Sequence, residues 1–399
     1  MKDILEPALE AFRANPASPI DRRDDDATLV CFSHLRWNFV FQRPQHLLTR
    51  AARTYRVFFM EEPIFQEMQA AYRLERHPQP GGVTVLVPVI RSGSSHDEIM
   101  AAQRDAVDEL VESIGHTPEV FWYYTPMALA FSNHIAPGIR IYDCMDELSA
   151  FRGAPVELVE QEQALFDCAD LVFTGGQSLY ESKRRRHHDV HAFPSSVDTA
   201  HFGKARSGEL TEPADQAGIP GPRIGFFGVI DERMDIALVD EVARLRPDWQ
   251  LIMIGPVVKI DPASLPKRPN IHWLGSKSYD DLPAYLVGWD AAFMPFALNE
   301  STKFISPTKT PEFLAAGLQV VSTPITDVVR PYGEKAMVGI AGTAAETVEA
   351  LERALAPASP EWTATVERHL AQMSWDKTWG DMAANIERVT GSVRQHVRA

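Results

Sequence analysis

The chain of 399 residues is too long for a single compact core, and its length predicts two or three domains. Its composition, with 45% hydrophobic and 23% charged residues, is typical of a soluble globular protein, and its net charge of −15 disfavours a nucleic-acid binder. An anionic small molecule can still bind such a chain, provided that cations are placed locally against the overall field.

The cysteine content and the N-terminus bear on the cellular compartment. Cys31, Cys144 and Cys168 are too few and too widely spaced for a disulfide framework or a Cys-x-x-Cys metal pair, which suits a reducing cytoplasm. The N-terminal segment has acids and prolines where a signal peptide needs an apolar core. No uncharged run reaches the ~18 residues of a membrane span. We therefore expect a cytoplasmic protein, and peripheral contact with the inner face of the cell membrane stays open.

The first half of the chain predicts an α/β domain. Residues 1–26 are polar and contain prolines, so we expect a loose arm or a short helix there. Continuous apolar runs, as in strands covered on both faces, then alternate with amphipathic segments. The predicted strands are 28–35, 55–63, 83–90, 119–126, 139–147 and 170–176, with helices at 96–115 and 155–170. This alternation predicts a mostly parallel sheet in an N-terminal domain of residues 27–202.

The pattern stops and then restarts. Gly, Pro and charged residues dominate 203–222, which predicts a linker. The restarted alternation predicts a second doubly wound domain, residues 223–375, and a C-terminal helix, residues 376–399. The predicted strands are 223–230, 249–256, 271–275, 290–296 and 318–325, with helices at 235–245 and 279–289 and a helical tail from 359. Two such domains would leave a ligand-binding cleft between the carboxyl ends of their strands.

The stretch 306–317, SPTKTPEFLAAG, predicts a short buried helix. Thr310 followed by Pro311 suits an N-cap and a first helical position, and Gly317 suits the C-terminal end. Ser306 followed by Pro307 is an alternative start one turn earlier. Both starts remain open.

One lysine and one glutamate lie near the start of this helix. Lys309 adds a positive charge where helix N-termini favour a phosphate. Glu312 cannot pair with phosphate, but its carboxylate can accept hydrogen bonds from two vicinal hydroxyls. The pair is therefore predicted to bind the diphosphate and ribose of a nucleotide. The alternative is that Glu312 merely complements the helix dipole and Lys309 is a solvated surface charge.

Three segments together resemble the GT-B glycosyltransferases, in particular the large bacterial group 1 type family that builds polysaccharides from nucleotide sugars. They are 32–48 (FSHLRWNFVFQRPQHLL), 142–151 (YDCMDELSAF) and 299–325 (NESTKFISPTKTPEFLAAGLQVVSTPI). The resemblance covers residues 28 to about 390 and is nearest to transferases of polysaccharide and teichuronic acid synthesis. It implies two Rossmann-like domains that face each other across a cleft, and a C-terminal helix that crosses back to the N-terminal domain.

The resemblance implies a set of donor-binding residues. Glu312 would hold the ribose hydroxyls and Lys309 the diphosphate, and Thr308 is a further candidate for binding the donor nucleotide. The family's usual pattern has another glutamate eight positions before the ribose one, where this chain has Phe304. The substitutes that we would test for binding the donor sugar or phosphate are Asn299, Glu300 and Lys303.

A second phosphate element is expected in the loop after residues 223–230. Gly225 and Gly228 permit close approach of a ligand to the backbone. Where the family often carries an arginine and a lysine, this chain has Val229 and then Arg233, whose guanidinium suits a diphosphate. The alternative for Arg233 is an ordinary surface arginine. The nucleotide base is expected to stack on Tyr279 or Trp273, with core packing the better interpretation of Trp273.

A polar and aromatic turn follows the first strand. We expect it to form a cleft wall that touches donor phosphate or acceptor, because it lies at the carboxyl end of a strand. Pro44 would open the next helix. The alternative is a hydrogen-bonded loop anchored by Trp37 and Phe39. The candidate residues are His34, Arg36, Trp37, Gln42 and Arg43.

Two aspartates at another strand end are candidates for the catalytic base. An inverting glycosyltransferase needs a group that takes the acceptor proton, and Asp146 is the first candidate and Asp143 the second. In a retaining enzyme the donor phosphate can take that proton instead. The alternative for both residues is loop capping.

The remaining motifs complete the expected function. The basic run 183–188 is interpreted as a solvated helix end, or alternatively as a contact for anionic lipid or a lipid-diphosphate acceptor. No metal-binding motif is present, so we expect no metal or other cofactor besides the nucleotide-sugar co-substrate. The sequence thus predicts a glycosyltransferase. The alternatives are a sugar-nucleotide epimerase or hydrolase of the same fold, and a catalytically silent scaffold subunit of a polysaccharide-assembly complex.

Overall fold

The computed structural model describes residues 27–397, with side chains up to residue 391, so the predicted N-terminal arm lies outside the described residues. The described chain divides into two compact units. One comprises residues up to Asp143, Glu160–Val172 and residues from Asp381 onward, and the other comprises Cys144–Val159 and Phe173–Gly380. The domain boundaries that we placed at 202 and 223 stay a prediction.

The first sheet contains nine strands among the described residues, in the order β3-β5-β2-β1-β6-β7-β8-β9, with β4 antiparallel on β5. All five residues of β1 are buried, and β1 pairs in parallel with β2 on one side and β6 on the other. The continuous apolar runs therefore mark fully covered strands, as predicted. The bounds are β1 Thr28–Phe32, β2 Arg56–Met60, β3 Ile64–Gln66, β4 Tyr72–Pro78, β5 Val83–Arg91, β6 Val120–Tyr123, β7 Ile139–Cys144, β8 Leu171–Thr174 and β9 Val190–Ala192.

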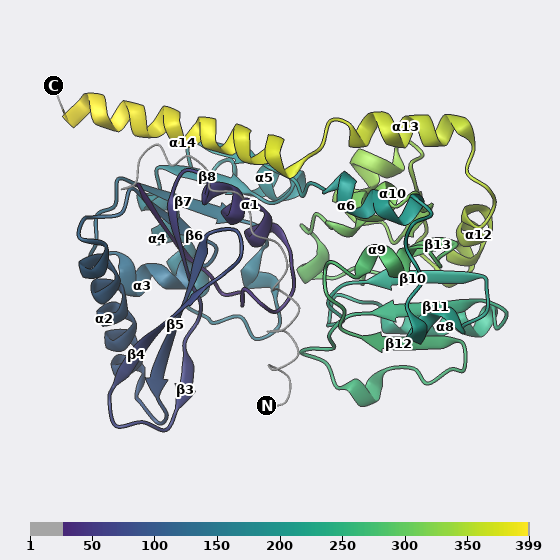
Figure 1. Cartoon of the computed structure of the whole chain (residues 1–399), viewed down its shortest axis with the longest axis horizontal. Helices are drawn as coiled ribbons and strands as arrows, with labels where there is room; N and C mark the ends of the chain where they lie inside the picture. Colours follow the sequence, from purple (N-terminus) through teal and green to yellow (C-terminus); the bar gives the residue numbers. More distant parts are fainter. Residues whose placement is uncertain (1–26, 398–399) are drawn as a thin grey trace. The chain divides into compact units, whose positions relative to one another are not determined.

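The helices of this half of the chain follow the predicted alternation. Figure 1 shows α2 alongside β4 and β5. Helix α2 begins after its N-cap residue Ser95, whose side chain accepts a hydrogen bond from the Glu98 amide. It ends before Gly115, which adopts a left-handed conformation. The bounds are α1 Arg43–Ala51, α2 His96–Ile114, α3 Leu129–Ser132, α4 Leu158–Cys168 and α5 Gln177–Lys183.

The second sheet has six parallel strands in the order β12-β11-β10-β13-β14-β15. The strand order reverses between β10 and β13, and doubly wound sheets bind ligands outside the carboxyl ends of the strands at such a switch point. The bounds are β10 Arg223–Phe227, β11 Gln250–Ile254, β12 Ile271–Gly275, β13 Ala291–Met294, β14 Val320–Ser322 and β15 Val338–Ile340.

Helices cover both faces of the second sheet (Figure 1). On one face, α8 and α12 pack on Ile224 and Phe226 of β10. On the other face, α9, α10 and α13 pack around Phe227. The doubly wound architecture of this unit is as predicted. The bounds are α6 Thr199–Gly203, α7 Ala214–Ala217, α8 Ile236–Leu245, α9 Leu282–Leu286, α10 Lys309–Ala315, α11 Thr326–Val328, α12 Ala344–Ala354, α13 Pro360–Leu370 and α14 Trp375–Val397.

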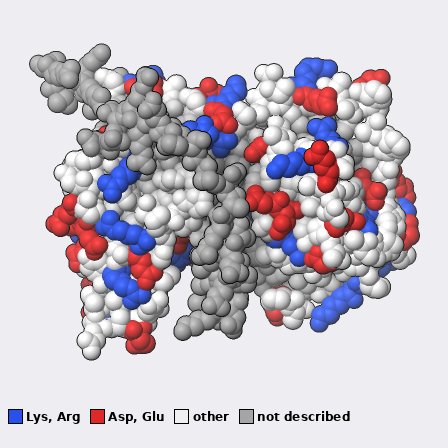
Figure 2. All heavy atoms as spheres, viewed as in Figure 1, with Lys and Arg blue, Asp and Glu red and all other residues white. Residues whose placement is uncertain are grey.

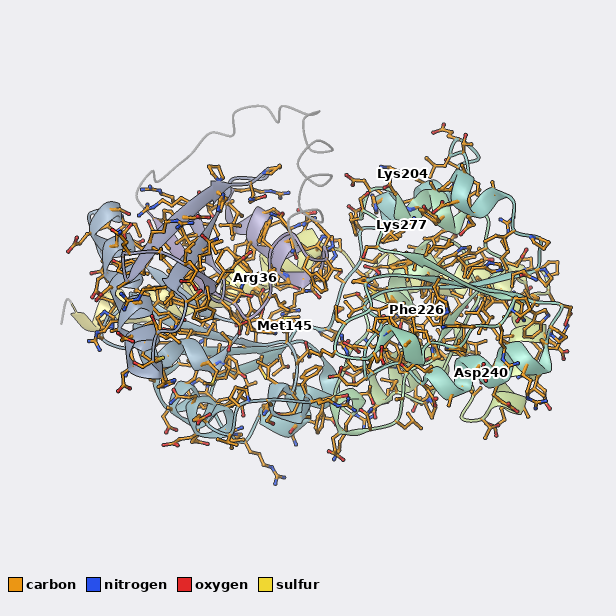
Figure 3. The ribbon with its side chains drawn as sticks, turned by 90° about the horizontal axis from the view of Figure 1, so that it is seen from below. Arg36, Met145, Lys204, Phe226, Asp240 and Lys277 are labelled. Carbon is orange, nitrogen blue, oxygen red and sulfur yellow. The ribbon has the colours of Figure 1, made fainter. Side chains whose placement is uncertain are left out.

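The segment 203–222, expected to be a linker, is packed against the second sheet's helices. Gln216 is fully buried, donates from Nε2 to the Tyr285 carbonyl at 2.8 Å and accepts from Trp289 Nε1 at 2.8 Å. Lys277, labelled in Figure 3, pairs with Asp215 at 2.6 Å. The Gly and Pro content of this segment predicted its lack of long helices but not these tertiary contacts.

Candidate active site

Two loops at the switch point form the candidate site. The loop 228–235 leaves β10, and the segment 295–308 leaves β13 and leads into α10. Hydrogen bonds join them: the Asp235 amide donates to the Pro295 carbonyl and the Ala297 amide to the Arg233 carbonyl, both at 2.8 Å. Backbone held on both sides in this way gives the side chains of these loops fixed positions.

The two glycines predicted to permit close backbone approach differ in what approaches them. A Cβ on Gly225 would overlap the Trp289 ring, so this glycine makes room for core packing rather than for a ligand. Gly228 has φ of +151°, and a Cβ there would lie 3.4 Å from Lys309 Cε and 3.1 Å from Phe226 Cζ (Phe226 is labelled in Figure 3). The chain thus brings Gly228 and Lys309 together from distant parts of the sequence, as the nucleotide hypothesis requires.

Lys309 and Glu312 form an ion pair on α10. The Lys309 ammonium lies 3.3 Å from Glu312 Oε2, donates to Thr308 Oγ1 at 2.9 Å and lies 5.2 Å from the centre of the Phe227 ring. The Lys309 side chain is 20% exposed and that of Glu312 only 6%. The solvated-lysine alternative therefore does not describe Lys309. Residues three positions apart share one helix face, which explains how two charges meet in an apolar surrounding.

The Glu312 carboxylate is incompletely satisfied. Its Oε2 accepts no hydrogen bond from a described residue, so the contact with Lys309 is an ion pair only. Burial raises the pKa of Glu312, and Lys309 offsets part of the rise. A buried carboxylate with unused acceptor capacity costs stability. It is also ready to accept hydrogen bonds from hydroxyl groups of a ligand.

The start of α10 differs from both predicted starts. The helix begins at Lys309 with Thr308 as N-cap, whereas Thr310 is fully buried inside the helix and its amide donates to the Pro307 carbonyl at 3.3 Å. Pro311 is tolerated at the third position because the first amides of a helix lack intrahelical partners anyway. The end at Gly317, with φ of +84°, is confirmed. The tip therefore offers fewer unused amides than expected, and Lys309 is the cation at its first position.

Arg233 is held by its neighbour Asp231. Its Nε lies 3.0 and 3.1 Å from the two Asp231 oxygens, and its Nη2 donates to Oδ2 at 2.7 Å. Burial lowers the pKa of Arg233, but the hydrogen bonds to Asp231 and the charges of Asp231, Asp146 and Glu232 together outweigh this and raise it. The guanidinium lies 5.4 Å from the centre of the Phe151 ring. Arg233 is thus a fixed cation rather than a mobile surface arginine.

Asn299, Glu300 and Lys303 do not converge on the Lys309–Glu312 pair. Asn299 caps the short 3₁₀ turn Glu300–Thr302, and its Oδ1 accepts from Ser301 Oγ at 2.7 Å. Glu300 and Lys303 face solvent with side chains 81% and 57% exposed and are 3.8 Å apart. The geometry therefore favours structural and surface roles for these three residues.

Tyr279 and Trp273, the candidates for base stacking, differ in their surroundings. The Tyr279 ring stacks on His201 with centroids 4.2 Å apart and planes 8° apart, and its carbonyl is 3.0 Å from His201 Nε2. Burial lowers the pKa of His201, which favours the neutral imidazole. Trp273 packs against the core and donates from Nε1 to the Pro266 carbonyl at 3.1 Å, which confirms the core interpretation. Base binding by Tyr279 stays a prediction.

The turn after β1 is anchored by one carboxylate. Glu61 accepts from Arg36 Nη1 at 3.0 Å and from the Trp37 amide at 2.7 Å, and Arg36 (labelled in Figure 3) also donates to the Pro63 carbonyl. Trp37 is buried against Phe59. These contacts favour the hydrogen-bonded loop over a ligand-binding wall.

The other turn residues are less uniform. Phe39, expected to anchor the loop with Trp37, is 46% exposed instead. His34 is half-buried. Gln42 precedes α1, and its amide donates to Gln45 Oε1 at 3.0 Å. Pro44 stands at the second position of α1, which confirms that it opens this helix.

Arg43 and Asp143 form a buried ion pair. Arg43 Nε lies 3.1 Å from Asp143 Oδ2 and Nη2 lies 2.9 Å from Oδ1, and both side chains are almost completely excluded from solvent. A carboxylate engaged in this way is poorly suited to take a proton from a substrate. The structure therefore corrects the expectation for both residues: Arg43 does not line a cleft wall, and Asp143 is a structural partner rather than a base.

Asp146 follows β7 and is half-buried, and its charge acts on Arg233. Of the two aspartates it is the one that the structure leaves as a candidate base. The adjacent Glu147 pairs with Lys183 at 2.7 Å, and Lys183 is buried. Lys183 therefore belongs neither to a solvated helix end nor to a lipid contact, whereas Arg184 and Arg185 are exposed.

Sequence reasoning missed two carboxylates of the β10 loop. Asp231 orients Arg233, and the carboxylate oxygens of Glu232 are buried without a hydrogen-bond partner among the described residues. The available signal in the sequence was two adjacent acidic residues directly before an arginine in a strand-end loop. Whether such acids are functional depends on their burial, which a single sequence does not give.

Surface charge and metal ligation add little to this site. Figure 2 shows acidic and basic side chains interspersed over the visible face of the second unit rather than a single basic surface. Within residues 27–397, no three His, Cys, Asp or Glu side chains are arranged to hold a metal ion. None of the helices in this range combines the length and apolar character needed to cross a membrane.

Comparison with known proteins adds independent findings. Residues 221–357 match the family described as glycosyl transferases group 1. A protein of Bacillus subtilis (strain 168), named as a teichuronic acid biosynthesis glycosyltransferase, is 24% identical over 296 residues, which cover 69% of this chain and 72% of that protein. Sucrose-phosphate synthase from Thermosynechococcus elongatus has a TM-score of 0.67 at 13% identity, with 92% of this chain and 100% of that chain covered. The Anabaena protein HepE in complex with UDP and glucose has a TM-score of 0.62 at 12% identity, with 90% and 99% covered.

Proposed function

Since the chain is a glycosyltransferase of the group 1 type with the GT-B fold, we propose that it moves a sugar from a UDP- or GDP-sugar to a hydroxyl of a saccharide or lipid-linked saccharide in surface polysaccharide biosynthesis. The observation that carries this proposal is the buried Lys309–Glu312 pair beside Gly228. The Bacillus subtilis relative's link to teichuronic acid and the UDP bound by the Anabaena protein support it.

The donor would bind along the switch point of the second sheet. Glu312 accepts hydrogen bonds from the two ribose hydroxyls, and Lys309, with Thr308 beside it, binds the diphosphate. Gly228 lets the diphosphate approach the backbone, and Arg233 supplies a second cation. The two cations neutralise the charge that develops on the leaving diphosphate, and they do so in a partly dry surrounding where they are most effective.

The transfer step follows from the chemistry of the donor. The acceptor oxygen forms a bond to the anomeric carbon as the bond from that carbon to the diphosphate oxygen breaks, and the electron pair leaves with the nucleoside diphosphate. The acceptor proton goes to a base. We propose Asp146 for this role, because it lies at a strand's carboxyl end and its charge reaches Arg233. In the retaining alternative, the leaving phosphate takes the proton.

The cellular setting is part of the same proposal. A lipid-linked acceptor would place the enzyme in the cytoplasm at the inner face of the cell membrane. The exposed arginines 184 and 185 are the candidates for contact with its phosphates.

Nucleotide binding is the first test of the function. UDP or GDP is expected to raise the melting temperature progressively with concentration, because a ligand of the native state stabilises it by mass action. CMP serves as a control nucleotide without a diphosphate. Donor turnover that needs no acceptor would indicate a hydrolase or epimerase instead. No shift with either nucleoside diphosphate would favour the scaffold alternative and contradict the proposal.

The affinity for the nucleotide is expected to fall in mildly acidic buffer. Burial raises the pKa of Glu312, so this carboxyl takes up its proton at a higher pH than an ordinary glutamate. The affinity for the nucleotide is therefore highest above this raised pKa and falls as the pH falls through it, because the protonated Glu312 carboxyl accepts fewer hydrogen bonds. Calorimetric titrations across this pH range would measure the loss. Glu312→Gln should retain only the pH dependence of the phosphate, and identical profiles for the two proteins would exclude this role of Glu312.

A further inference from the structure

Glu232 is a buried carboxylate for which the proposed transfer step has no use. Its side chain is 9% exposed, and neither Oε1 nor Oε2 accepts a hydrogen bond from any residue that the structure describes. The nearby cation is Lys259, whose side chain is exposed and whose ammonium lies 3.7 Å from Oε1. A buried carboxylate with two unsatisfied oxygens costs stability. Such a group retains hydrogen-bonding capacity that a bound ligand can use.

The backbone around Glu232 is fixed at the switch point. Its carbonyl accepts a hydrogen bond from Asn299 Nδ2 at 3.2 Å, on the segment that leads from β13 into α10. On the other side, the Ile230 amide donates to the Pro256 carbonyl at 2.9 Å, in the loop that follows β11. The loop is thus tied to the exits of both neighbouring strands. Glu232 is therefore held in place rather than carried by a mobile segment.

The neighbours of Glu232 indicate the kind of ligand. The next residue, Arg233, is the proposed diphosphate cation, and its guanidinium lies 5.4 Å from the Phe151 ring centre. The Lys259 ammonium lies 4.9 Å from the same ring. A carboxylate repels a diphosphate, so Glu232 cannot bind the phosphates themselves. In a nucleotide sugar, the group attached to the diphosphate beyond the nucleoside is a sugar, whose hydroxyls are neutral hydrogen-bond donors.

We infer that Glu232 is a specificity-determining residue that binds the transferred sugar, its two oxygens accepting hydrogen bonds from two hydroxyls of the donor. This inference rests on the proposed function. Two acceptor oxygens match a pair of neighbouring hydroxyls, and a buried acceptor left unpaired by an analogue without them gives strong discrimination. Asn299, Glu300 and Lys303 do not compete for the role, because the first is used as a cap and the other two face solvent.

The test separates recognition of the sugar from recognition of the nucleotide. Calorimetry would compare UDP with UDP-glucose and GDP with GDP-mannose, on the wild-type chain and on Glu232→Gln. The wild type is expected to bind one of the nucleotide sugars more tightly than its nucleotide. Glu232→Gln is expected to bind the nucleotide as before and to lose about ten- to hundredfold of the preference for the sugar, the range for hydrogen bonds to a charged group.

Two further variants separate a direct contact of Glu232 with the sugar from an effect through Lys259 or through charge alone. Lys259→Met removes the neighbouring ammonium and is expected to leave the preference for the sugar intact. If Lys259→Met lost as much of this preference as Glu232→Gln, Glu232 would act only by positioning Lys259 and would not contact the sugar. Glu232→Asp keeps the negative charge on a side chain that is one methylene shorter, so this variant should also lose the preference for the sugar. The melting temperature of Glu232→Gln should equal or exceed that of the wild type, because a buried carboxylate without hydrogen bonds is removed.

Different outcomes would contradict sugar binding by Glu232 and the proposed glycosyltransferase function. An unchanged preference in Glu232→Gln, or a wild type that prefers neither sugar over its nucleotide, overturns the inference and leaves nucleotide binding intact. Absence of binding to UDP and GDP in the wild type contradicts the proposed function itself.

Discussion

Lys309→Ala is expected to lower kcat/KM for sugar transfer by about 10²–10³-fold, the range measured when one preorganised group that stabilises developing charge is removed. The ammonium lies in a largely buried position, over Phe227 and 3.3 Å from Glu312. A charge at such a place acts strongly because little water screens it. The variant also leaves the Glu312 carboxylate without its cation, which weakens binding of the diphosphate further.

Lys303→Ala is the matched control for this experiment. It removes a lysine from the same segment, whose side chain is 57% exposed. Steady-state kinetics of both variants should show a loss for Lys309→Ala alone. Equal activities of the two variants would show that Lys309 does not serve the reaction.

Asp146→Asn is expected to lower kcat by about 10²–10⁴-fold, the usual contribution of a general base, while nucleotide affinity changes little. The amide keeps the shape of the side chain and cannot take up the acceptor proton. The acidic limb of the pH–rate profile, which reports the ionisation of the base, should disappear in the variant.

Asp143→Asn provides the contrast to this variant. Its carboxylate is completely buried and paired with Arg43, so the substitution should lower the melting temperature rather than remove the acidic limb of the profile. A decrease of less than about tenfold in kcat for Asp146→Asn, well below the range of a general base, would leave the proton to the leaving phosphate and remove Asp146 from the mechanism.

The fold was predictable because strands buried on both faces of a sheet appear in the sequence as continuous apolar runs. The continuous apolar runs of β1, β2 and β10 each lie between parallel neighbours, and each was found from its residues alone. The four strands that we missed, β3, β4, β9 and β15, do not follow this pattern. β4 is largely exposed and antiparallel, with charged residues along its length, and the other three have three residues each.

The site was predictable only where its residues are neighbours in sequence. Lys309 and Glu312 lie three positions apart on one helix, so their meeting followed from helical geometry. The pairing of Arg43 with Asp143 joins residues 100 positions apart and turned two predicted functional residues into structural ones. No local pattern encodes such a contact.

Burial decided the remaining cases. Glu300 and Glu232 are both glutamates next to strand-end loops, but the former is 81% exposed and the latter almost completely enclosed. The start of α10 depended in the same way on tertiary packing, since Thr310 is enclosed in the core and its hydroxyl lies 3.6 Å from Met294 Sδ. A single sequence gives the residue types. The burial that determines the role of each side chain comes from segments that are distant in the sequence.

A crystal structure of the protein with whichever of UDP and GDP raises its melting temperature would show directly whether Lys309 and Glu312 bind the nucleotide. We expect a diphosphate oxygen within hydrogen-bond distance of Lys309 Nζ and both ribose hydroxyls on the Glu312 carboxylate. A nucleotide bound elsewhere, with the Lys309–Glu312 pair untouched, would contradict this expectation.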